Sequence, residues 1–186
     1  VENSPHATLC LNADDSMVAS IADRVDNDVV FYGVDCEIYP ERVEDLSDAT
    51  HCIKCGAEYQ YDYVTYAHLG GFKCPSCGYH RPKPKVAVER IVERRSDGCT
   101  VELRVDDDRS IVDLDVPASY DVYNCACVVA GLEAFKFPRE QAYLAISKFK
   151  HGFGRSEVFD LDGTRAQPND RVLPLRGGQI TAAAQL

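Results

Sequence analysis

The chain has 186 residues, of which 45% are hydrophobic and 27% are charged. This composition predicts an ordered domain with its own core and excludes a chain that is disordered throughout. The sequence contains no run of about 20 apolar residues that could span a membrane, and its N-terminus lacks the features of a secretory signal. We therefore expect a cytoplasmic protein.

The net charge of −10 comes entirely from the first part of the chain. Residues 1–50 carry 12 acidic and 2 basic side chains, whereas residues 51–186 carry 18 of each kind. An acidic chain does not attract the phosphate backbone of DNA or RNA. The charge therefore predicts that no nucleic acid is a partner.

The segment 1–50 is predicted to form a β-α-β unit of an α/β fold. Ala7–Asn12 and Val29–Val34 are short apolar runs typical of buried strands, and Met17–Arg24 between them has helical spacing. Buried strands on either side of a helix indicate a parallel sheet covered on both faces. The residues that can cap the helix are Asp14, Asp15 and Ser16.

The segment 51–82 contains two C-x-x-C pairs separated by an aromatic-rich spacer. Each pair lets two thiolates reach one tetrahedral metal ion, and the glycine after each pair suits the positive φ of a knuckle. The spacer predicts a small hairpin, so we expect a zinc ribbon whose structural zinc ion is coordinated by protein alone. The predicted ligands are Cys52, Cys55, Cys74 and Cys77.

The residues leave other uses of these cysteines open. A redox pair fits less well, because two pairs occur at ribbon spacing, whereas an iron centre of the rubredoxin type uses similar ligands. The nearby histidines are expected to be surface or supporting residues: His51, His68 and His80. The other cysteines are expected to be small buried side chains: Cys10, Cys36, Cys99, Cys125 and Cys127.

The segment 83–157 is predicted to complete the α/β domain with three strands and two helices, the first two strands forming a hairpin. The expected elements cover Val86–Arg94, Thr100–Val105, Ile111–Val116, Asn124–Phe135 and Pro138–Lys150. The first helix is apolar almost all round and should be deeply buried. Residues 158–186 give weak signals, and we expect them to begin a further domain and end in a loose tail.

Taken in order, several motifs resemble those of the Mur ligase family. The first strands are similar to the second half of the family's central ATPase domain, and later segments resemble its HNxxN-type element and its GRxE-type hinge. The inserted cysteine ribbon resembles one branch of the family, the MurT-type subunit of lipid II isoglutaminyl synthase. The segments are Leu11–Asp15, Val29–Gly33, Pro117–Asn124, His151–Glu157 and Tyr66–Pro82, and the resemblance covers roughly residues 7–160.

The resemblance implies a ligase of peptidoglycan synthesis that uses ATP and magnesium. In that reaction ATP phosphorylates the α-carboxyl of D-glutamate in the stem peptide of lipid II. Ammonia from a partner glutaminase subunit then replaces the phosphate and leaves D-isoglutamine. Lipid II would be both the substrate and the only contact with the membrane.

The resemblance also implies nucleotide contacts. Asn124 would contact adenine and Arg155 would reach the phosphates of ATP, for which its guanidinium is suited. Asn12 and Asp15 would lie at the carboxyl end of a strand, where open α/β sheets bind ligands. The residues alone also allow Asn124 and Asp15 to be helix caps and Arg155 to form an ion pair with Glu157. No catalytic nucleophile or base is identified.

The sequence departs from the family in ways that bear on activity. It contains no G-x-x-x-x-G-K-[ST] phosphate loop, and Asp121 and Ala118 stand where the family usually has Asn and Gly. We therefore expect a fragment that is inactive alone, lacking the phosphate loop and the C-terminal domain. The alternatives are a non-catalytic zinc-stabilised interaction module and, less consistent with the charge, a zinc ribbon that binds nucleic acid.

Overall fold

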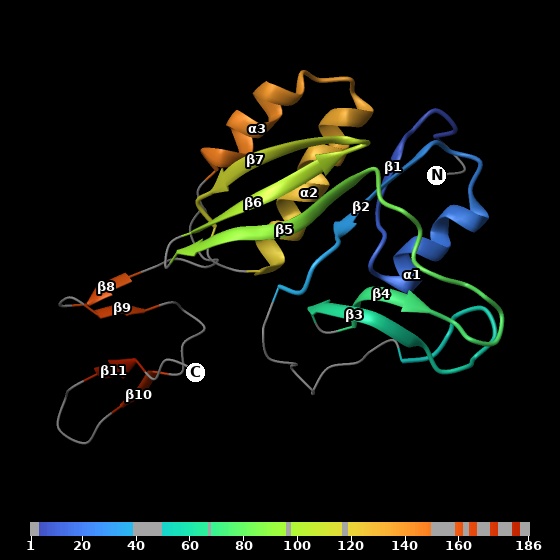
Figure 1. Cartoon of the computed structure of the whole chain (residues 1–186), viewed down its shortest axis with the longest axis horizontal. Helices are drawn as coiled ribbons and strands as arrows, with labels where there is room; N and C mark the ends of the chain where they lie inside the picture. The colour runs from blue at the N-terminus through green and yellow to red at the C-terminus, as the bar shows by residue number, and fades with distance from the viewer. Residues whose placement is uncertain are drawn as a thin grey trace. The chain divides into compact units, whose positions relative to one another are not determined.

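The computed structural model describes residues 4–38, 50–66, 68–95, 98–116 and 119–149, and the short strands 159–161, 164–166, 172–174 and 180–182. The chain divides into two compact units, Val1–Phe149 and Lys150–Leu186. The first unit contains the main sheet, its helices and the cysteine-rich segment (Figure 1). Among the described residues, no helix combines the length and apolar character needed to cross a bilayer.

A mixed sheet with strand order β1-β2-β5-β6-β7 forms the centre of the first unit. β1, β2 and β5 run parallel, whereas β5, β6 and β7 form an antiparallel meander. The α/β class predicted from sequence is confirmed, although only the first part of the sheet is parallel. The strands cover Leu9–Asn12 (β1), Val29–Val34 (β2), Val86–Arg95 (β5), Gly98–Val105 (β6) and Asp108–Leu114 (β7).

Side-chain burial follows from the place of each strand in the sheet. β6 is an interior strand, between β5 and β7, and is buried along almost its whole length. β7 lies at the edge, where Val112 and Leu114 point into the core, whereas Ile111, which precedes them, is 57% exposed and Asp113 between them is exposed as well. This alternation is the period-two pattern of a strand with one solvated face.

Two helices pack against the sheet and close the core. α2 (Ser119–Ala134) contacts β1, β2 and β5, and α3 (Arg139–Ser147) contacts β7 and α2 (Figure 1). α2 begins five positions before the predicted start at Asn124. Its inner residues Val122, Ala126 and Val129 are deeply buried, as predicted, whereas Val128 on its outer face is exposed. Pro138 is the residue before α3 rather than its first residue.

The predicted helix after β1 is shorter and more tightly wound than expected. α1 covers Ser16–Ala19 and continues as a 3₁₀-helix, η1, over Ser20–Arg24. Asp15 caps α1, because its Oδ1 accepts the amides of Met17 at 2.8 Å and Val18 at 3.1 Å. The cap that the sequence suggested is therefore present.

The cysteine-rich segment occupies the connection between β2 and β5. Its hairpin consists of β3 (Gln60–Tyr66) and β4 (Leu69–Lys73), which pair antiparallel. Figure 1 shows this hairpin beside α1, near the end of the sheet to which β1 leads. We call residues 50–81 the ribbon. It stands where a crossover helix would join two parallel strands in an ordinary β-α-β unit.

The second unit contains two antiparallel pairs of short strands within its described residues. The first pair is β8 (Phe159–Leu161) with β9 (Thr164–Ala166), and the second is β10 (Val172–Pro174) with β11 (Ile180–Ala182).

Candidate functional site

The four predicted metal ligands lie together at one end of the ribbon. The sulfurs of Cys52, Cys55, Cys74 and Cys77 are all within 4.8 Å of one another. The Sγ atoms of Cys52 and Cys77 are 3.6 Å apart, and those of Cys55 and Cys74 are 3.5 Å apart. A zinc–sulfur bond of about 2.3 Å places sulfurs about 3.8 Å apart at the corners of a tetrahedron. The donor set therefore fits an ion of this size.

The two knuckles repeat the same backbone hydrogen bonds. Cys52 N donates to Ala57 O and Cys74 N donates to Tyr79 O, each at 2.7 Å. The amides of Gly56 and Gly78 donate back to the carbonyls of the first cysteine in their own pair. Both glycines have φ of +76°, which side chains with a Cβ rarely adopt. The positive φ predicted after each pair is confirmed.

The protein environment favours thiolates at the first cysteine of each pair. Burial opposes ionisation of Cys52, but the amides of Lys54 and Cys55 outweigh it and lower the pKa of this thiol to about 6. The amide of Cys77 lowers the pKa of Cys74, with a second contribution from the amide of Ser76. Thiolates are the form that binds a metal ion.

Aromatic rings form a small core beneath the knuckles. Tyr59 and Phe72 are buried, with ring centroids 5.3 Å apart, and Tyr79 lies 5.4 Å from Phe72. Cys52, Cys74 and Ala19 of α1 belong to the same apolar cluster. Tyr59 is thus a core residue of this segment. The ribbon core extends onto the first helix of the sheet domain.

A buried polar cluster joins the ribbon to the carboxyl ends of β1 and β2. Asp14 is fully buried, and its Oδ1 accepts Arg81 Nε at 2.5 Å. Its Oδ2 accepts the Val34 amide at 2.8 Å and the Tyr123 hydroxyl at 2.6 Å. Arg81 Nη2 also pairs with Asp35 Oδ1 at 2.7 Å. We call Asp14, Asp35, Arg81 and Tyr123 the Asp14 cluster.

Burial sets the ionisation of this cluster. It raises the pKa of the Asp14 carboxyl, against the opposing effects of Arg81, Tyr123 and the Val34 amide. Burial also raises the pKa of Tyr123, so its hydroxyl keeps its proton and donates to Asp14. Asp35 receives a second guanidinium from Arg104, at 3.2 Å. The cluster therefore satisfies its buried charges by mutual pairing.

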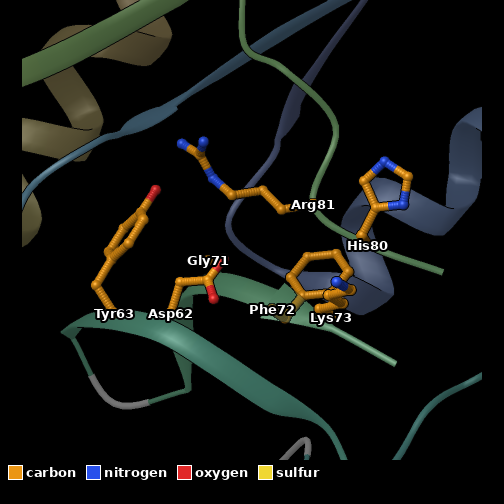
Figure 2. A pocket seen from close by; sticks show the side chains of 7 residues that line it. All are labelled: Asp62, Tyr63, Gly71, Phe72, Lys73, His80 and Arg81. Carbon is orange, nitrogen blue, oxygen red and sulfur yellow. The ribbon is translucent and has the colours of Figure 1, made fainter. Parts of the chain in front are cut away.

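Figure 2 shows the hollow at the ribbon side of this cluster, with Tyr63 and Arg81 directed into the same space. The hollow has a volume of about 420 Å³, and Arg81 lies over the Tyr63 ring at 5.8 Å from its centroid. Lys73 and His80 also line it. Because Arg81 is already paired with two carboxylates, its charge is directed toward the protein rather than toward a ligand.

Gly33 provides the space that the Asp14 cluster occupies. A Cβ at this position would lie 2.5 Å from Asp14 Oδ1 and 2.7 Å from Arg81 Nη2. We expect Gly33→Ala to destabilise the protein by about 1–3 kcal/mol in chemical unfolding, the usual cost of overpacking. Gly131→Ala in α2 is the control, because nothing lies within 4 Å of its Cβ; it should stabilise by about 0.5–1 kcal/mol. Equal effects would contradict the steric role of Gly33.

Asn12 is the last residue of β1 and Asp15 caps α1 just after it, so both lie at the carboxyl end of this strand, as expected. Asn12 Oδ1 accepts the Asp14 amide at 3.0 Å, and both oxygens of Asp15 have protein neighbours, with His68 Nε2 3.6 Å from Oδ2. Their hydrogen bonds to nearby amides shape the β1–α1 turn, and Asp15 also lies beside His68 of the ribbon. A nucleotide role for either residue stays a prediction.

Asn124 lies in α2, one residue after Tyr123 of the Asp14 cluster. It is exposed, and its Nδ2 donates to Asp121 at 3.4 Å. Since α2 begins at Ser119, Asn124 is inside the helix and the alternative of an N-cap was wrong. Arg155 and Glu157 lie outside the described residues. Contact of Asn124 with adenine and of Arg155 with phosphate stays a prediction.

The sequence analysis missed the Asp14 cluster. Asp14 was predicted only as a possible helix cap, and no buried ion pair was predicted for Arg81. Charged residues have no apolar periodicity, so spacing gives no sign that they are buried. One available signal was Gly33 inside an apolar strand, since such a glycine often marks a close approach of other groups.

Comparison with curated proteins supports the family resemblance. The chain is 22% identical over 161 residues to the lipid II isoglutaminyl synthase (glutamine-hydrolyzing) subunit MurT of Staphylococcus aureus (strain COL). It is 24% identical over 162 residues to the corresponding subunit of Streptococcus pneumoniae (strain ATCC BAA-255 / R6). Each match covers 87% of this chain and 35% of the relative, so the chain spans about a third of the length of these proteins. No family model matches the sequence.

Solved structures with a similar fold are Mur-type ligases. A pseudomurein peptide ligase type C from Methanothermus fervidus superposes with a TM-score of 0.68 at 28% identity, over 81% of this chain and 29% of that protein. MurF from Acinetobacter baumannii gives a TM-score of 0.55 at 13% identity, over 87% and 25% of the two chains, and shows the fold alone. The predicted resemblance to Mur ligases is confirmed.

Proposed function

We propose that this chain is part of an ATP-dependent amide-forming subunit of the Mur ligase type, acting in peptidoglycan synthesis. The observation that carries the proposal is the likeness over most of the chain to both MurT subunits and a pseudomurein ligase. The parallel strands β1 and β2 end at a polar turn, which is where open α/β sheets bind their ligands. The substrates and partners below come from the named relatives.

The proposed reaction amidates the D-glutamate α-carboxyl of lipid II. The carboxylate oxygen attacks the γ-phosphorus of ATP; the bond from this phosphorus to the bridging oxygen breaks, which gives an acyl phosphate and releases ADP. Ammonia from a glutaminase subunit attacks the acyl carbon, and inorganic phosphate departs to leave D-isoglutamine. Magnesium would neutralise the phosphates in this chemistry. The reaction would take place at the cytoplasmic face of the membrane, which the protein would touch only through lipid II.

We assign the cysteine site to one structural zinc ion. Four thiolates complete a tetrahedral shell and leave no position open to substrate, so the ion would contribute folding energy rather than chemistry. Metal analysis of the purified chain distinguishes zinc from iron, which accepts the same ligands.

A second candidate is formation of a peptide bond rather than of a primary amide. It is favoured by the pseudomurein peptide ligase from Methanothermus fervidus, which is 28% identical to this chain, whereas the MurT subunits are 22% and 24% identical. Both reactions pass through an acyl phosphate and differ in the nucleophile. Because this chain is expected to be inactive alone, the test requires the whole subunit of which it is proposed to be a part. In that subunit, ammonium ions that stimulate the release of phosphate from ATP would favour amidation, whereas stimulation by an amino acid would favour the peptide ligase.

Calorimetric titration of the chain with ATP and magnesium tests whether a nucleotide site is present. We expect micromolar binding, about −8 kcal/mol, that Asn124→Ala weakens roughly tenfold through loss of an adenine contact. Gln141→Ala, an exposed amide on α3, is the control and should leave the affinity unchanged. An absence of binding at millimolar ATP would instead favour a non-catalytic interaction module.

A further inference from the structure

The ribbon holds the turn between β1 and α1 through contacts with Asp14 and Ser16. The Gly70 amide donates to Asp14 O at 3.2 Å, and the Arg81 side chain binds the Asp14 carboxylate. The Tyr79 hydroxyl donates to Ser16 O at 2.8 Å. We call residues 13–16 the β1–α1 loop. Ribbon residues therefore bind this loop through both the backbone carbonyl and the side chain of Asp14.

The ribbon residues that make these contacts are fixed by the second knuckle. Tyr79 follows Gly78 directly, and its carbonyl accepts the amide of Cys74, a metal ligand. Arg81 lies two positions further on, and its amide donates to Phe72 O at 2.9 Å. The side chains that hold the β1–α1 loop therefore extend from a segment whose backbone depends on the knuckle.

The β1–α1 loop also lies at the end of the sheet where strands β1 and β2 terminate. The carboxylate of Asp14 accepts the amide of Val34, the last residue of β2, and the amide of Ala13 donates to Tyr32 O. Asp14 is fully buried, so its charge has no access to water as an alternative partner. If Arg81 moved away, the loop would lose a charge-assisted bond that solvent could replace only by opening the structure.

We infer that metal binding by the four cysteines orders the β1–α1 loop, with Tyr79 and Arg81 carrying the effect from the second knuckle to the loop. Arg81 is a positioning residue in this arrangement. The inference rests on the metal site proposed above and is independent of the ligase chemistry. The cysteine site would thus determine the conformation of the β1–α1 loop as well as that of the ribbon.

Hydrogen exchange followed by mass spectrometry, on the whole chain with and without one equivalent of zinc, tests the inference. Native mass spectrometry establishes how many ions are bound. We expect removal of the ion to raise exchange in peptides covering residues 13–19 roughly ten- to hundredfold, as loss of a charge-assisted hydrogen bond implies. Peptides covering β6 and β7 should keep their protection.

Arg81→Lys in the zinc-loaded chain tests the role of Arg81 separately from metal binding. Lysine keeps the charge but cannot bridge Asp14 and Asp35 with a planar fork. We expect zinc to remain stoichiometric and peptides around Gly56 to stay protected, while residues 13–19 exchange at least about tenfold faster. Arg90→Lys is the control, because Arg90 forms an exposed ion pair with Glu102; this variant should change none of these values.

Three results would overturn the inference. The first is failure of the chain to bind zinc or iron, which would remove the metal site as well. The second is loss of the ion with unchanged exchange at residues 13–19, or with an equal rise throughout the sheet. The third is full protection of residues 13–19 in zinc-loaded Arg81→Lys.

Discussion

Replacing Cys74 with serine is expected to destabilise the protein by about 3 kcal/mol or more. Binding of a structural zinc ion contributes about 10–16 kcal/mol to the folding of zinc-finger peptides, and the loss of one thiolate forfeits much of it. Cys74 is buried and lies 3.5 Å from the sulfur of Cys55, so a hydroxyl there leaves the coordination shell incomplete. Chemical unfolding of zinc-loaded protein measures the difference.

Cys10→Ser is the matched control for this prediction. Cys10 lies in β1, where it is half-buried and packs against the main core, away from the four clustered cysteines. Its replacement should cost about 1–2 kcal/mol, as for other small buried groups. A chelator should also reduce the stability of Cys10→Ser by as much as that of the unmodified chain, yet leave Cys74→Ser nearly unchanged. Equal costs for the two variants would refute the structural metal site.

Asp14→Ala is expected to cost about 3–5 kcal/mol, the penalty for removing one partner of a buried ion pair. The variant would leave the Arg81 guanidinium without its closest carboxylate and would deprive the Val34 amide and Tyr123 hydroxyl of their acceptor. Urea unfolding monitored by circular dichroism provides the measurement. Asp62→Ala, an exposed carboxylate on the ribbon hairpin, should change stability by less than about 0.5 kcal/mol.

A double variant separates the cost of an unpaired charge from the value of the pair. Asp14→Leu combined with Arg81→Met removes both charges and retains apolar volume, so it should be less destabilised than the sum of the single variants. Additive effects would mean that Asp14 and Arg81 do not interact in solution.

The sequence predicted those parts of the molecule in which short-range patterns determine the structure. Val29–Val34 was predicted with the bounds that the structure shows, because a strand buried in a parallel sheet is a continuous apolar run. The ribbon hairpin and the positive φ of Gly56 and Gly78 also follow from residues close in the chain.

The remaining features depend on contacts between distant residues. Asp14 is 67 positions from Arg81 and 109 positions from Tyr123, so no local sequence pattern predicts that these residues cluster. The start of α2 was placed too late because Asn124 has the side chain of a cap, whereas burial of Val122 and Tyr123 extends the helix toward Ser119. Tertiary packing outweighed local preference here.

The position of the ribbon between β2 and β5 also has a kinetic consequence. These strands pair in parallel, Tyr32 opposite Val86, so the intervening loop must close before the sheet can form. Pairing between residues far apart in sequence is the slow step in the folding of many domains. An ion bound by both Cys52 and Cys77, which are 25 positions apart, would cross-link this loop and so reduce the number of residues in the loop that must close. The cysteine site would then influence how fast the sheet forms as well as how stable it is.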